Sequence, residues 1–543
     1  RAWSGFTDTL TGRLEGQVLE QYLKTARWYR EKTRKIRSIE VTDRIPIGTG
    51  DEKTWLITVN LDFTDDKTDT YVMPLATALR EEAEAVQAET PVAVIARLQM
   101  SDVEGVLYDG VYSSDFREEI MRLFLARKKL KGTAGEIQVT RGRRLRQLAR
   151  DFEAPYTSRV MKVEQSNSSV LYKEHFFFKL YRKLEDGLNP DVELLRHLTE
   201  RSRFENVPPF AASLEYAGGG FESASLGELM GFVPNEGDGL AYATSSVDRY
   251  FDNLLANKQE EPPKPSLPKE PLDISLATLP EEVYSYVDGF FLEMMDLLGV
   301  RTGEMHLALA MKTGEKAFDP EPFSKLYQRS VYQSLRSLFR RVMNTVRRVG
   351  KQSRQSDPAV AEYADLLATR ESEIMAQFSA ITGRKIHAQK TRIHGDYHLQ
   401  QVLFTGRDFI VIDLEGEPAR TLGERRLKYC PLRDIAGMIR SFHYAVYGRY
   451  LQYADVRPED ADYLAEWIDP WYRMVSGIFL NAYRRTVGDA AFVPSDPEEL
   501  RLLLDVFLLE KAVYEVGYEI NNRPDWLRIP VNGIQFILER SGT

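Results

Sequence analysis

The chain has 543 residues, of which 43% are hydrophobic and 28% are charged. This balance is typical of globular proteins and excludes the disordered and fibrous classes. The formal net charge of −9 argues against nucleic acid as a partner, because binding to a phosphate backbone requires a basic face. No apolar run reaches the roughly 18 residues of a membrane span, and no signal peptide is recognisable, so we expect no membrane association.

The length predicts two or three domains. The single cysteine, Cys430, permits no intrachain disulfide, which is typical of a reducing compartment. We therefore expect a cytoplasmic protein with a buried core thiol. The chain begins with Arg1 rather than Met, which is consistent with a fragment of a longer polypeptide.

Residues 1–95 are predicted to form a small α+β unit without catalytic chemistry. Residues 14–29 have helical spacing of their apolar side chains, and residues 55–63 alternate between apolar and polar types, as a half-buried strand does. A turn at residues 65–67 and a return strand from Tyr71 complete a hairpin. We expect a structural role for this unit.

Residues 96–233 are predicted to be rich in strands and to hold a nucleotide-binding site. Lys179 follows the apolar strand 176–178, and Glu193 lies in a helix opened by Asn189 and Pro190, a favourable helix start. A strand lysine paired with a helix glutamate is the device that contacts the α- and β-phosphates in kinases. A lysine that merely lies at a strand end is the alternative interpretation.

No glycine occurs in residues 165–170, so this loop is not a glycine-rich phosphate loop. We expect a polar loop to cover the phosphates with its hydroxyl, amide and backbone N–H groups, through Ser166, Asn167, Ser168 and Ser169. Met230, Phe232 and Val233 lie where a hinge would meet adenine. Residues 234–543 are predicted to be mostly helical, with His306 as a buried structural histidine.

Residues 392–418 carry the strongest catalytic signal. Asp396 lies in a His-Gly-Asp triplet, Gln401 follows five residues later, and Asp413 and Glu415 come after a predicted hairpin of residues 402–404 and 409–412. The hairpin would bring Gln401 and Asp413 to the same end. An HxD triplet alone is common, but this combination is what phosphoryl transfer requires.

In this arrangement Asp396 orients the attacking hydroxyl and accepts its proton, while Gln401, Asp413 and Glu415 offer the hard oxygen donors that Mg²⁺ prefers. His394 shapes the turn, and His398 is placed to hydrogen-bond a sugar hydroxyl. These assignments predict Mg²⁺ as a cofactor.

A terminal helix, residues 498–520, is predicted to bind the sugar. Lys511, Tyr514 and Tyr518 share one side, and Glu515 and Glu519 share another. Arg523 and Trp526 follow the helix. Aromatic rings suit the C–H face of a disaccharide and carboxylates suit its hydroxyls, although plain helix packing explains any single residue equally well.

The stretch HGDYHLQQVLF with VIDLEGEP resembles the catalytic segments of the aminoglycoside-phosphotransferase-like kinases, and most of all the maltokinases. Gln401 stands where most members of the wider family have Asn. The ARWY sequence, QSNSSV, LGVRTGEMHLAL and the EKAVYEVGYE segment with RPDW resemble maltokinases too. Asp434 resembles the aspartate that braces the catalytic loop in this superfamily.

The resemblance implies an α+β, bilobal fold like that of eukaryotic protein kinases, with an N-terminal cap. The expected domains are the cap at 1–95, a nucleotide-binding N-lobe at 96–233 and a helical C-lobe at 234–543. The implied reaction is the phosphorylation of maltose to maltose 1-phosphate, with ATP as the phosphoryl donor, on the route from trehalose to glycogen. A trehalose synthase domain or subunit is the implied protein partner.

Two alternatives stay open. A related kinase acting on glucosamine or an aminoglycoside would use the same catalytic residues, and the terminal helix offers both the aromatic rings of a disaccharide site and the carboxylates of an amino-sugar site. A catalytically silent partner module of trehalose synthase is the other alternative, although such a module would not need the full set of Lys179, Glu193, Asp396, Gln401 and Asp413.

Overall fold

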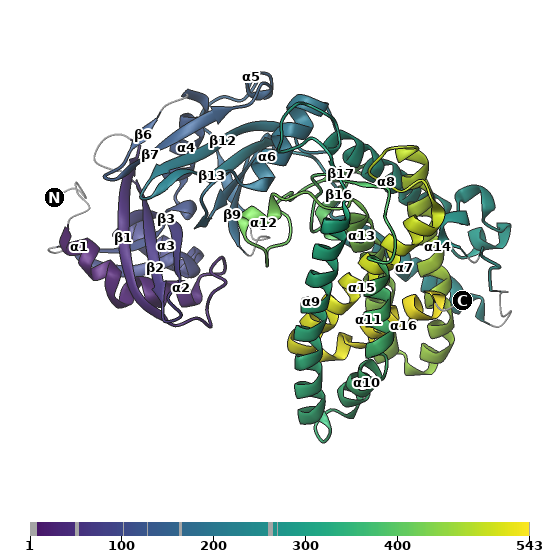
Figure 1. Ribbon diagram of the computed structural model, residues 1–543. Helices are drawn as coiled ribbons and strands as arrows, with labels where there is room; N and C mark the ends of the chain where they lie inside the picture. The colour runs from purple at the N-terminus through teal and green to yellow at the C-terminus, as the bar shows by residue number, and fades with distance from the viewer. Residues whose placement is uncertain are drawn as a thin grey trace. The chain divides into compact units, whose positions relative to one another are not determined.

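The computed structural model describes residues 8–48, 54–100, 103–126, 129–161, 166–258, 264–268 and 270–541. The chain divides into two compact units (Figure 1). The β-rich unit consists of Arg1–Arg201 with Pro208–Pro234, and the helical unit consists of Ser202–Val207 with Asn235–Thr543.

The β-rich unit begins with an antiparallel sheet in the order β1-β2-β3-β5-β4, with β11 also paired to β3. Its strands are β1 (Ile36–Ile47), β2 (Thr54–Phe63), β3 (Thr68–Leu79), β4 (Val94–Met100), β5 (Val103–Asp109) and β11 (Lys183–Leu184). The strand and hairpin predicted at residues 55–73 are confirmed by the β2–β3 pairing. Because β4 and β5 belong to this sheet, it continues past residue 95, where the sequence placed a domain boundary.

A second, seven-stranded sheet has the order β6-β7-β12-β13-β10-β9-β8. Its strands are β6 (Leu130–Lys131), β7 (Gly135–Arg141), β8 (Ser158–Val160), β9 (Asn167–Tyr172), β10 (Phe176–Tyr181), β12 (Phe210–Gly218) and β13 (Phe221–Gly231). Lys173 and Glu174 both have positive φ between β9 and β10, as a hairpin turn of the mirror-image kind requires. Strand β10 is followed directly by β11, so the chain passes from one sheet into the other.

The described part of the β-rich unit contains the α-helices α1 (Asp8–Arg13), α2 (Leu19–Thr25), α3 (Glu81–Glu89), α4 (Ser114–Ala126), α5 (Leu145–Leu148) and α6 (Pro190–His197). Leu19, Tyr22 and Leu23 of α2 belong to an apolar core with residues of the first sheet. Phe116, Ile120 and Phe124 of α4 pack instead into the core of the second sheet. The same core takes in Ile45, Ile47, Leu56 and Val72 of the first sheet, so the two sheets share part of their apolar packing.

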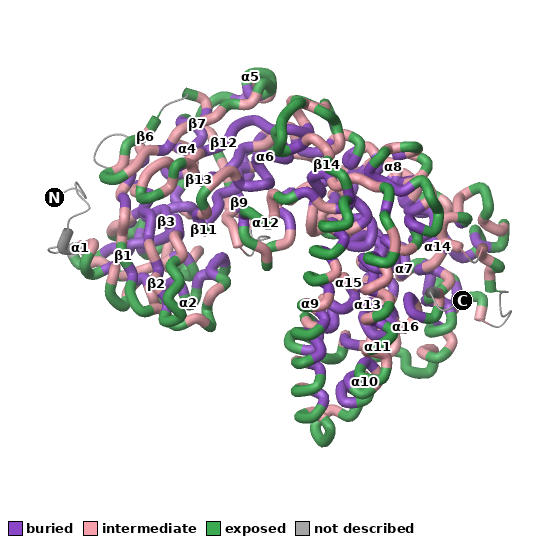
Figure 2. The backbone as a smooth tube through the Cα atoms, in the orientation of Figure 1, coloured by how far each residue is buried: buried purple, intermediate pink, exposed green. Residues whose placement is uncertain are grey.

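Long helices form the helical unit. They are α7 (Gly239–Ala256), α8 (Gly289–Leu309), α9 (Lys325–Ser353), α10 (Pro358–Thr369), α11 (Glu371–Ala380), α12 (Leu422–Arg425), α13 (Leu432–Val456), α14 (Ala461–Val487), α15 (Pro497–Asn522) and α16 (Arg528–Ser541). Two short strand pairs accompany them, β14 (Glu321–Pro322) with β15 (Gln389–Lys390) and β16 (Val402–Phe404) with β17 (Phe409–Val411). Helix α15 packs against α9, α11, α13 and α16. In Figure 2, α9 alternates between buried and exposed residues, as an amphipathic surface helix does.

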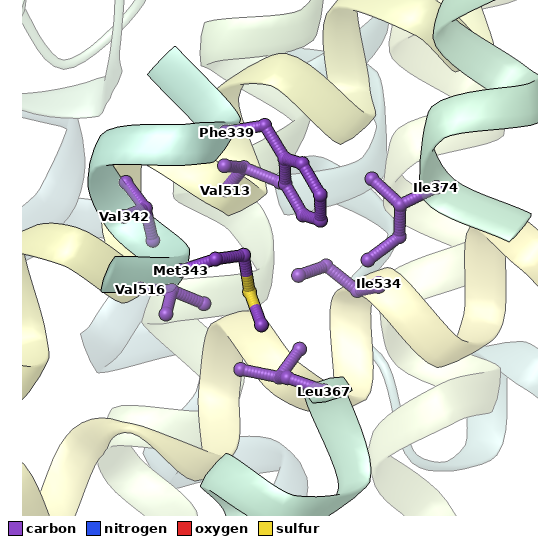
Figure 3. A pocket seen from close by; sticks show the side chains of 8 residues that line it. All are labelled: Phe339, Val342, Met343, Leu367, Ile374, Val513, Val516 and Ile534. Carbon is purple, nitrogen blue, oxygen red and sulfur yellow. The ribbon is translucent and has the colours of Figure 1, made fainter. Parts of the chain in front are cut away.

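A small apolar cavity lies between α9, α10, α11, α15 and α16 (Figure 3). Its volume, counted as the space that the centre of a water molecule can occupy, is about 10 Å³. The side chains that line it are Phe339, Val342, Met343, Leu367, Ile374, Val513, Val516 and Ile534. A buried water needs two to four polar partners, so we expect this cavity to be dry. It lies against the face of α15 opposite to Lys511 and Tyr514.

Cys430 is fully buried, and burial raises the pKa of its thiol to about 12. The predicted core thiol is therefore confirmed. Among the helices of the described ranges, none combines the length and the apolar character needed to cross a membrane.

Candidate active site

The turn that carries Asp396 is built by a close approach of two backbone segments in the helical unit. Gly395 has a φ of +88°, and a Cβ atom at this position would lie 3.2 Å from the Cα of Gly416, which itself has a φ of +76°. Glycine is the residue that adopts such a conformation without a steric penalty. The two glycines thus let the Asp396 turn lie against the segment that carries Asp413 and Glu415.

Asp434, at the start of α13, holds this turn in place. Its carboxylate accepts hydrogen bonds from the backbone N–H groups of His394 (2.8 Å) and Gly395 (2.9 Å), and the Nε2 of His306 lies 3.2 Å away. His306 is fully buried and its Nδ1 lies 3.0 Å from the Tyr483 hydroxyl. The contacts agree with the bracing role predicted for Asp434 and with the structural role predicted for His306.

His394 connects the turn to the hairpin rather than facing solvent. Its Nε2 lies 2.9 Å from the carbonyl oxygen of Ile412, and its Nδ1 lies 3.4 Å from the backbone nitrogen of Asp396. Both contacts are satisfied when Nε2–H donates and Nδ1 accepts. With both ring nitrogens in use, His394 shapes the turn, as expected from the sequence.

The β16–β17 hairpin places Gln401 beside Asp413. Val402 pairs with Val411 at the end of the ladder, and the backbone N–H of Ile412 donates to the carbonyl of Gln401 at 3.0 Å. The Gln401 amide then donates to the Asp413 carboxylate, with Nε2 and Oδ2 3.0 Å apart. Asp413 has a φ of +60°, a backbone conformation that is uncommon outside glycine and concentrates at functional sites.

This donor set fits Mg²⁺. Since the Gln401 amide nitrogen points to Asp413, its oxygen is the atom that could face a cation next to the Asp413 carboxylate. Hard amide and carboxylate oxygens are the ligands that Mg²⁺ takes. Glu415 is engaged differently, because Arg425 Nη1 lies 3.8 Å from its carboxylate and donates to its backbone oxygen at 3.3 Å.

Asp396 lies between two potential cations. Lys511 Nζ is 3.3 Å from its Oδ1, and His398 Nε2 is 3.8 Å from its Oδ2. Burial acts to raise the pKa of Asp396, but the charge of Lys511 and the contact with His398 outweigh it and hold that pKa well below its usual range. This environment favours the carboxylate form of Asp396.

Glu417 is a member of this site that the sequence reasoning did not single out. The Tyr514 hydroxyl donates to its carboxylate at 3.1 Å, and Lys511 Nζ lies 4.0 Å from it. Burial and the nearby charge of Asp396 raise the pKa of Glu417. The available signal was its place in the Glu-Gly-Glu-Pro run, two residues after Glu415.

The two predicted faces of the terminal helix have different environments. Lys511, Tyr514 and Tyr518 are partly or fully accessible, and Tyr518 is 49% exposed. Glu515 is buried against Arg440, with a shortest distance of 2.7 Å. Glu519 accepts from Arg523 at 2.7 and 2.9 Å and from the Tyr444 hydroxyl at 3.0 Å.

Arg523 and Trp526 close the end of α15. The Trp526 ring stacks on Tyr444 of α13, with centroids 6.3 Å apart and an interplanar angle of 27°. The Arg523 guanidinium lies 4.7 Å from the centre of the Trp526 ring. The aromatic rings and the guanidinium group contact one another. That they also contact a sugar remains a prediction.

In the β-rich unit, the carboxylate seen in contact with Lys179 is that of Asp191. The two side chains are 5% and 4% exposed, and Nζ and Oδ2 lie 2.8 Å apart. Helix α6 begins at Pro190 with the Asn189 side chain accepting from the N–H of Asp191, which confirms the predicted helix start. Glu193 is buried two residues further along α6, and its pairing with Lys179 stays a prediction.

The predicted polar phosphate loop is in large part a strand. Ser166 precedes β9, whereas Asn167, Ser168 and Ser169 lie within it and pair with β10, where Ser169 stands opposite Lys179. Strand pairing satisfies their backbone groups, which is why the prediction of a loop was wrong here. Arg182 Nε donates to the Ser168 hydroxyl at 2.8 Å.

The predicted hinge residues lie at the end of β13 and directly after it. Met230 lies in β13 opposite Phe177, and the backbone N–H of Phe232 donates to the carbonyl of His175 at 2.9 Å. The N–H of Phe232 is thus used within the protein, while Phe232 and Val233 are half-buried.

Comparison with known proteins gives the following likenesses. Residues 22–112 match the family model of the maltokinase N-terminal cap domain. The chain is 23% identical to a glucosamine kinase of Streptacidiphilus jiangxiensis over 382 residues, which cover 69% of this chain and 73% of that enzyme. It is 30% identical to a glucosamine kinase of Mycolicibacterium smegmatis over 152 residues, 27% of this chain but only 34% of that enzyme.

The fold of this chain is similar to that of solved kinase structures. A glucosamine kinase in complex with glucosamine, ADP and inorganic phosphate matches with a TM-score of 0.58 at 19% identity, covering 91% of this chain and 94% of that one. Crystal form B of a glucosamine kinase matches with a TM-score of 0.60 at 18% identity, covering 94% and 96%. The predicted α+β kinase-like fold with an N-terminal cap domain is confirmed, and the cap match extends beyond residue 95.

Proposed function

We propose that this protein is an ATP- and Mg²⁺-dependent sugar kinase that converts maltose to maltose 1-phosphate. The observation that carries the proposal is the environment of Asp396. Its turn is clamped by Asp434, its carboxylate is kept ionised, and it lies against the accessible Lys511–Tyr514 face of α15. A carboxylate in this state can orient and deprotonate a hydroxyl.

The reaction balances without a further reactant. The anomeric oxygen of maltose forms a bond to the γ-phosphorus of ATP, the bond from that phosphorus to the β,γ-bridging oxygen breaks, and ADP leaves with its electron pair. The hydroxyl proton passes to Asp396 and from there to solvent. The protein contributes chiefly positioning and charge compensation.

Gln401 and Asp413 would hold Mg²⁺, with Glu415 as a further candidate ligand, and the bound ion would neutralise charge on the nucleotide phosphates. Lys179 would contact the α- and β-phosphates, held by Asp191 and, as predicted from the sequence, by Glu193. Ser166, Asn167, Ser168 and Ser169 would lie along the phosphates, and Met230, Phe232 and Val233 along adenine.

Maltose is preferred as the acceptor because the face of α15 beside Asp396 is aromatic. Tyr514 and Tyr518 follow Lys511 on the same face of α15, and His398 adds a polar group near Asp396. The match of residues 22–112 to the maltokinase cap supports the same substrate. A cytoplasmic location and association with a trehalose synthase domain or subunit are part of the proposal. Glucosamine is the second candidate, favoured by the similarity to the two glucosamine kinases.

The test is ADP release with ATP and Mg²⁺ against maltose, glucose, glucosamine, trehalose and an aminoglycoside. Turnover with maltose and loss of its reducing end are expected. Asp396→Asn should lower kcat by about 10²- to 10⁴-fold, the usual contribution of a general base. The control is Asp365→Asn, which removes an exposed aspartate from α10 and should leave kcat unchanged.

Activity of Asp396→Asn within about threefold of wild type, far short of what a general base contributes, would remove Asp396 from its assigned role. No turnover of any sugar by a chain that still binds ADP would replace the proposal with a catalytically silent partner module. Turnover restricted to glucosamine would keep the mechanism and change the substrate.

A further inference from the structure

Four carboxylates lie on α15 or next to it, those of Asp396, Glu417, Glu515 and Glu519. Each is in contact with a positively charged side chain of the protein. Asp396 and Glu417 share Lys511, at 3.3 and 4.0 Å. Glu515 is paired with Arg440 at 2.7 Å, and Glu519 with Arg523 at 2.7 Å. Each acidic residue that could suggest a site for an amino sugar thus already has a cation in contact with it, although Asp396 and Glu417 share one.

Lys511 is the cation among these that a bound sugar could reach together with Asp396. Its side chain is 26% exposed, compared with 2% for Arg440, and its Nζ lies 5.4 Å from the centre of the Tyr514 ring. Although burial disfavours its charged form, Asp396 and Glu417 raise the pKa of Lys511. A fixed positive charge therefore lies beside the carboxylate that would take the proton.

We propose that Lys511 determines acceptor specificity by charge, so that the site takes a neutral sugar and rejects an amino sugar. This inference rests on the proposed kinase function, because it assigns Lys511 a role at the acceptor hydroxyl next to Asp396. A neutral hydroxyl can donate to Asp396 and accept a hydrogen bond from the Lys511 ammonium without disturbing the ion pairs.

The ammonium of an amino sugar bound at the same place would meet a like charge. Two unit charges a few ångströms apart near a protein surface repel strongly enough to change binding by more than tenfold. Relief of this repulsion would require a carboxylate, and the four carboxylates described above are occupied by Lys511, Arg440 and Arg523. A neutral disaccharide avoids this repulsion and can cover the ring of Tyr518 with its C–H face.

The experiment compares kcat/KM for maltose and for glucosamine in wild type, Lys511→Met and Lys511→Arg. Wild type should favour maltose. Lys511→Met should shift the maltose-to-glucosamine ratio toward glucosamine by at least about tenfold, in line with the removed repulsion, whereas Lys511→Arg should keep the wild-type preference. Lys351→Met is the matched control, since Lys351 is an exposed lysine in the last turn of α9, and it should change neither value.

A second variant predicts a shift of the opposite sign. Glu417→Gln removes one of the two negative charges beside Lys511, so glucosamine should be disfavoured further while maltose is still used. A thermal unfolding scan shows whether Lys511→Met is folded. If it is not, Glu417→Gln still tests the inference.

The outcomes separate the inference from the function on which it rests. A wild-type preference for glucosamine, or an equal loss of both activities in Lys511→Met with an unchanged ratio in Glu417→Gln, would overturn the role of Lys511 and leave the kinase function in place. Absence of turnover with both sugars in wild type would overturn the kinase function itself.

Discussion

Replacement of Asp434 by asparagine tests whether the catalytic turn depends on a single distant carboxylate. Asp434 accepts the N–H groups of both His394 and Gly395, and asparagine has one acceptor oxygen where aspartate has two. One N–H would then face the amide NH₂ group. A hydrogen bond to a charged group is worth about 1.5–3 kcal/mol, so we expect the turn to lose about 2–3 kcal/mol.

We expect Asp434→Asn to lower kcat more than it lowers the stability of the fold. A displacement of about 1 Å at the reacting groups can cost about 10²-fold in rate, so kcat should fall by about that factor, while the KM for ATP changes little because Lys179 lies in the β-rich unit. Steady-state kinetics measures the first effect, and thermal unfolding measures the loss of stability, expected to be a few degrees.

Asp505→Asn is the matched control for this experiment. Asp505 and Asp434 are equally buried, each at 2% exposure, and Asp505 pairs with Arg540 on α16, away from the turn. The control should therefore lose stability and keep kcat. The reasoning is refuted if both variants lose kcat to the same degree, or if Asp434→Asn retains kcat within about threefold, well below the cost of a misplaced reacting group.

Three further outcomes follow from the geometry. Gln401→Ala should raise the Mg²⁺ concentration for half-maximal activity by about tenfold, and an unchanged metal requirement would remove Gln401 from the ligands. Asp191→Asn breaks the buried pair with Lys179 and should destabilise the β-rich unit by about 3–5 kcal/mol in denaturant unfolding; an unchanged unfolding transition would contradict that pairing. Val516→Ile adds a methyl group to the dry cavity and should raise stability by up to about 0.8 kcal/mol with unchanged kcat; a lower melting temperature would show that the cavity cannot take it.

Much of the local structure could be predicted from the order of residues along the chain. The alternation in residues 55–63 specified β2, the turn residues between two apolar runs specified the β16–β17 hairpin, and Asn189 with Pro190 specified the start of α6. The same hairpin fixed the proximity of Gln401 and Asp413. These features depend on neighbours within a few residues, which periodicity and turn chemistry describe directly.

The sequence was less informative where a residue's backbone belongs to a larger sheet. The polar run Asn167 to Ser169 looks like a loop, because Ser and Asn favour turns, yet pairing with β10 draws it into β9. In the same way, spacing along α6 did not indicate that Asp191 contacts Lys179. The tertiary partner, and not the local preference, decided both cases.

By itself, the sequence determined the fold class and the residue types of the proposed catalytic segment. Only the tertiary structure decided which polar groups meet, because those pairs join distant parts of the chain. The His394 N–H and the Asp434 carboxylate are 40 residues apart, and Asp396 and Lys511 are 115 apart. No local pattern encodes such a pairing. It arises when apolar packing brings α13 and α15 against the catalytic turn, and the buried carboxylates there require cations and N–H donors nearby.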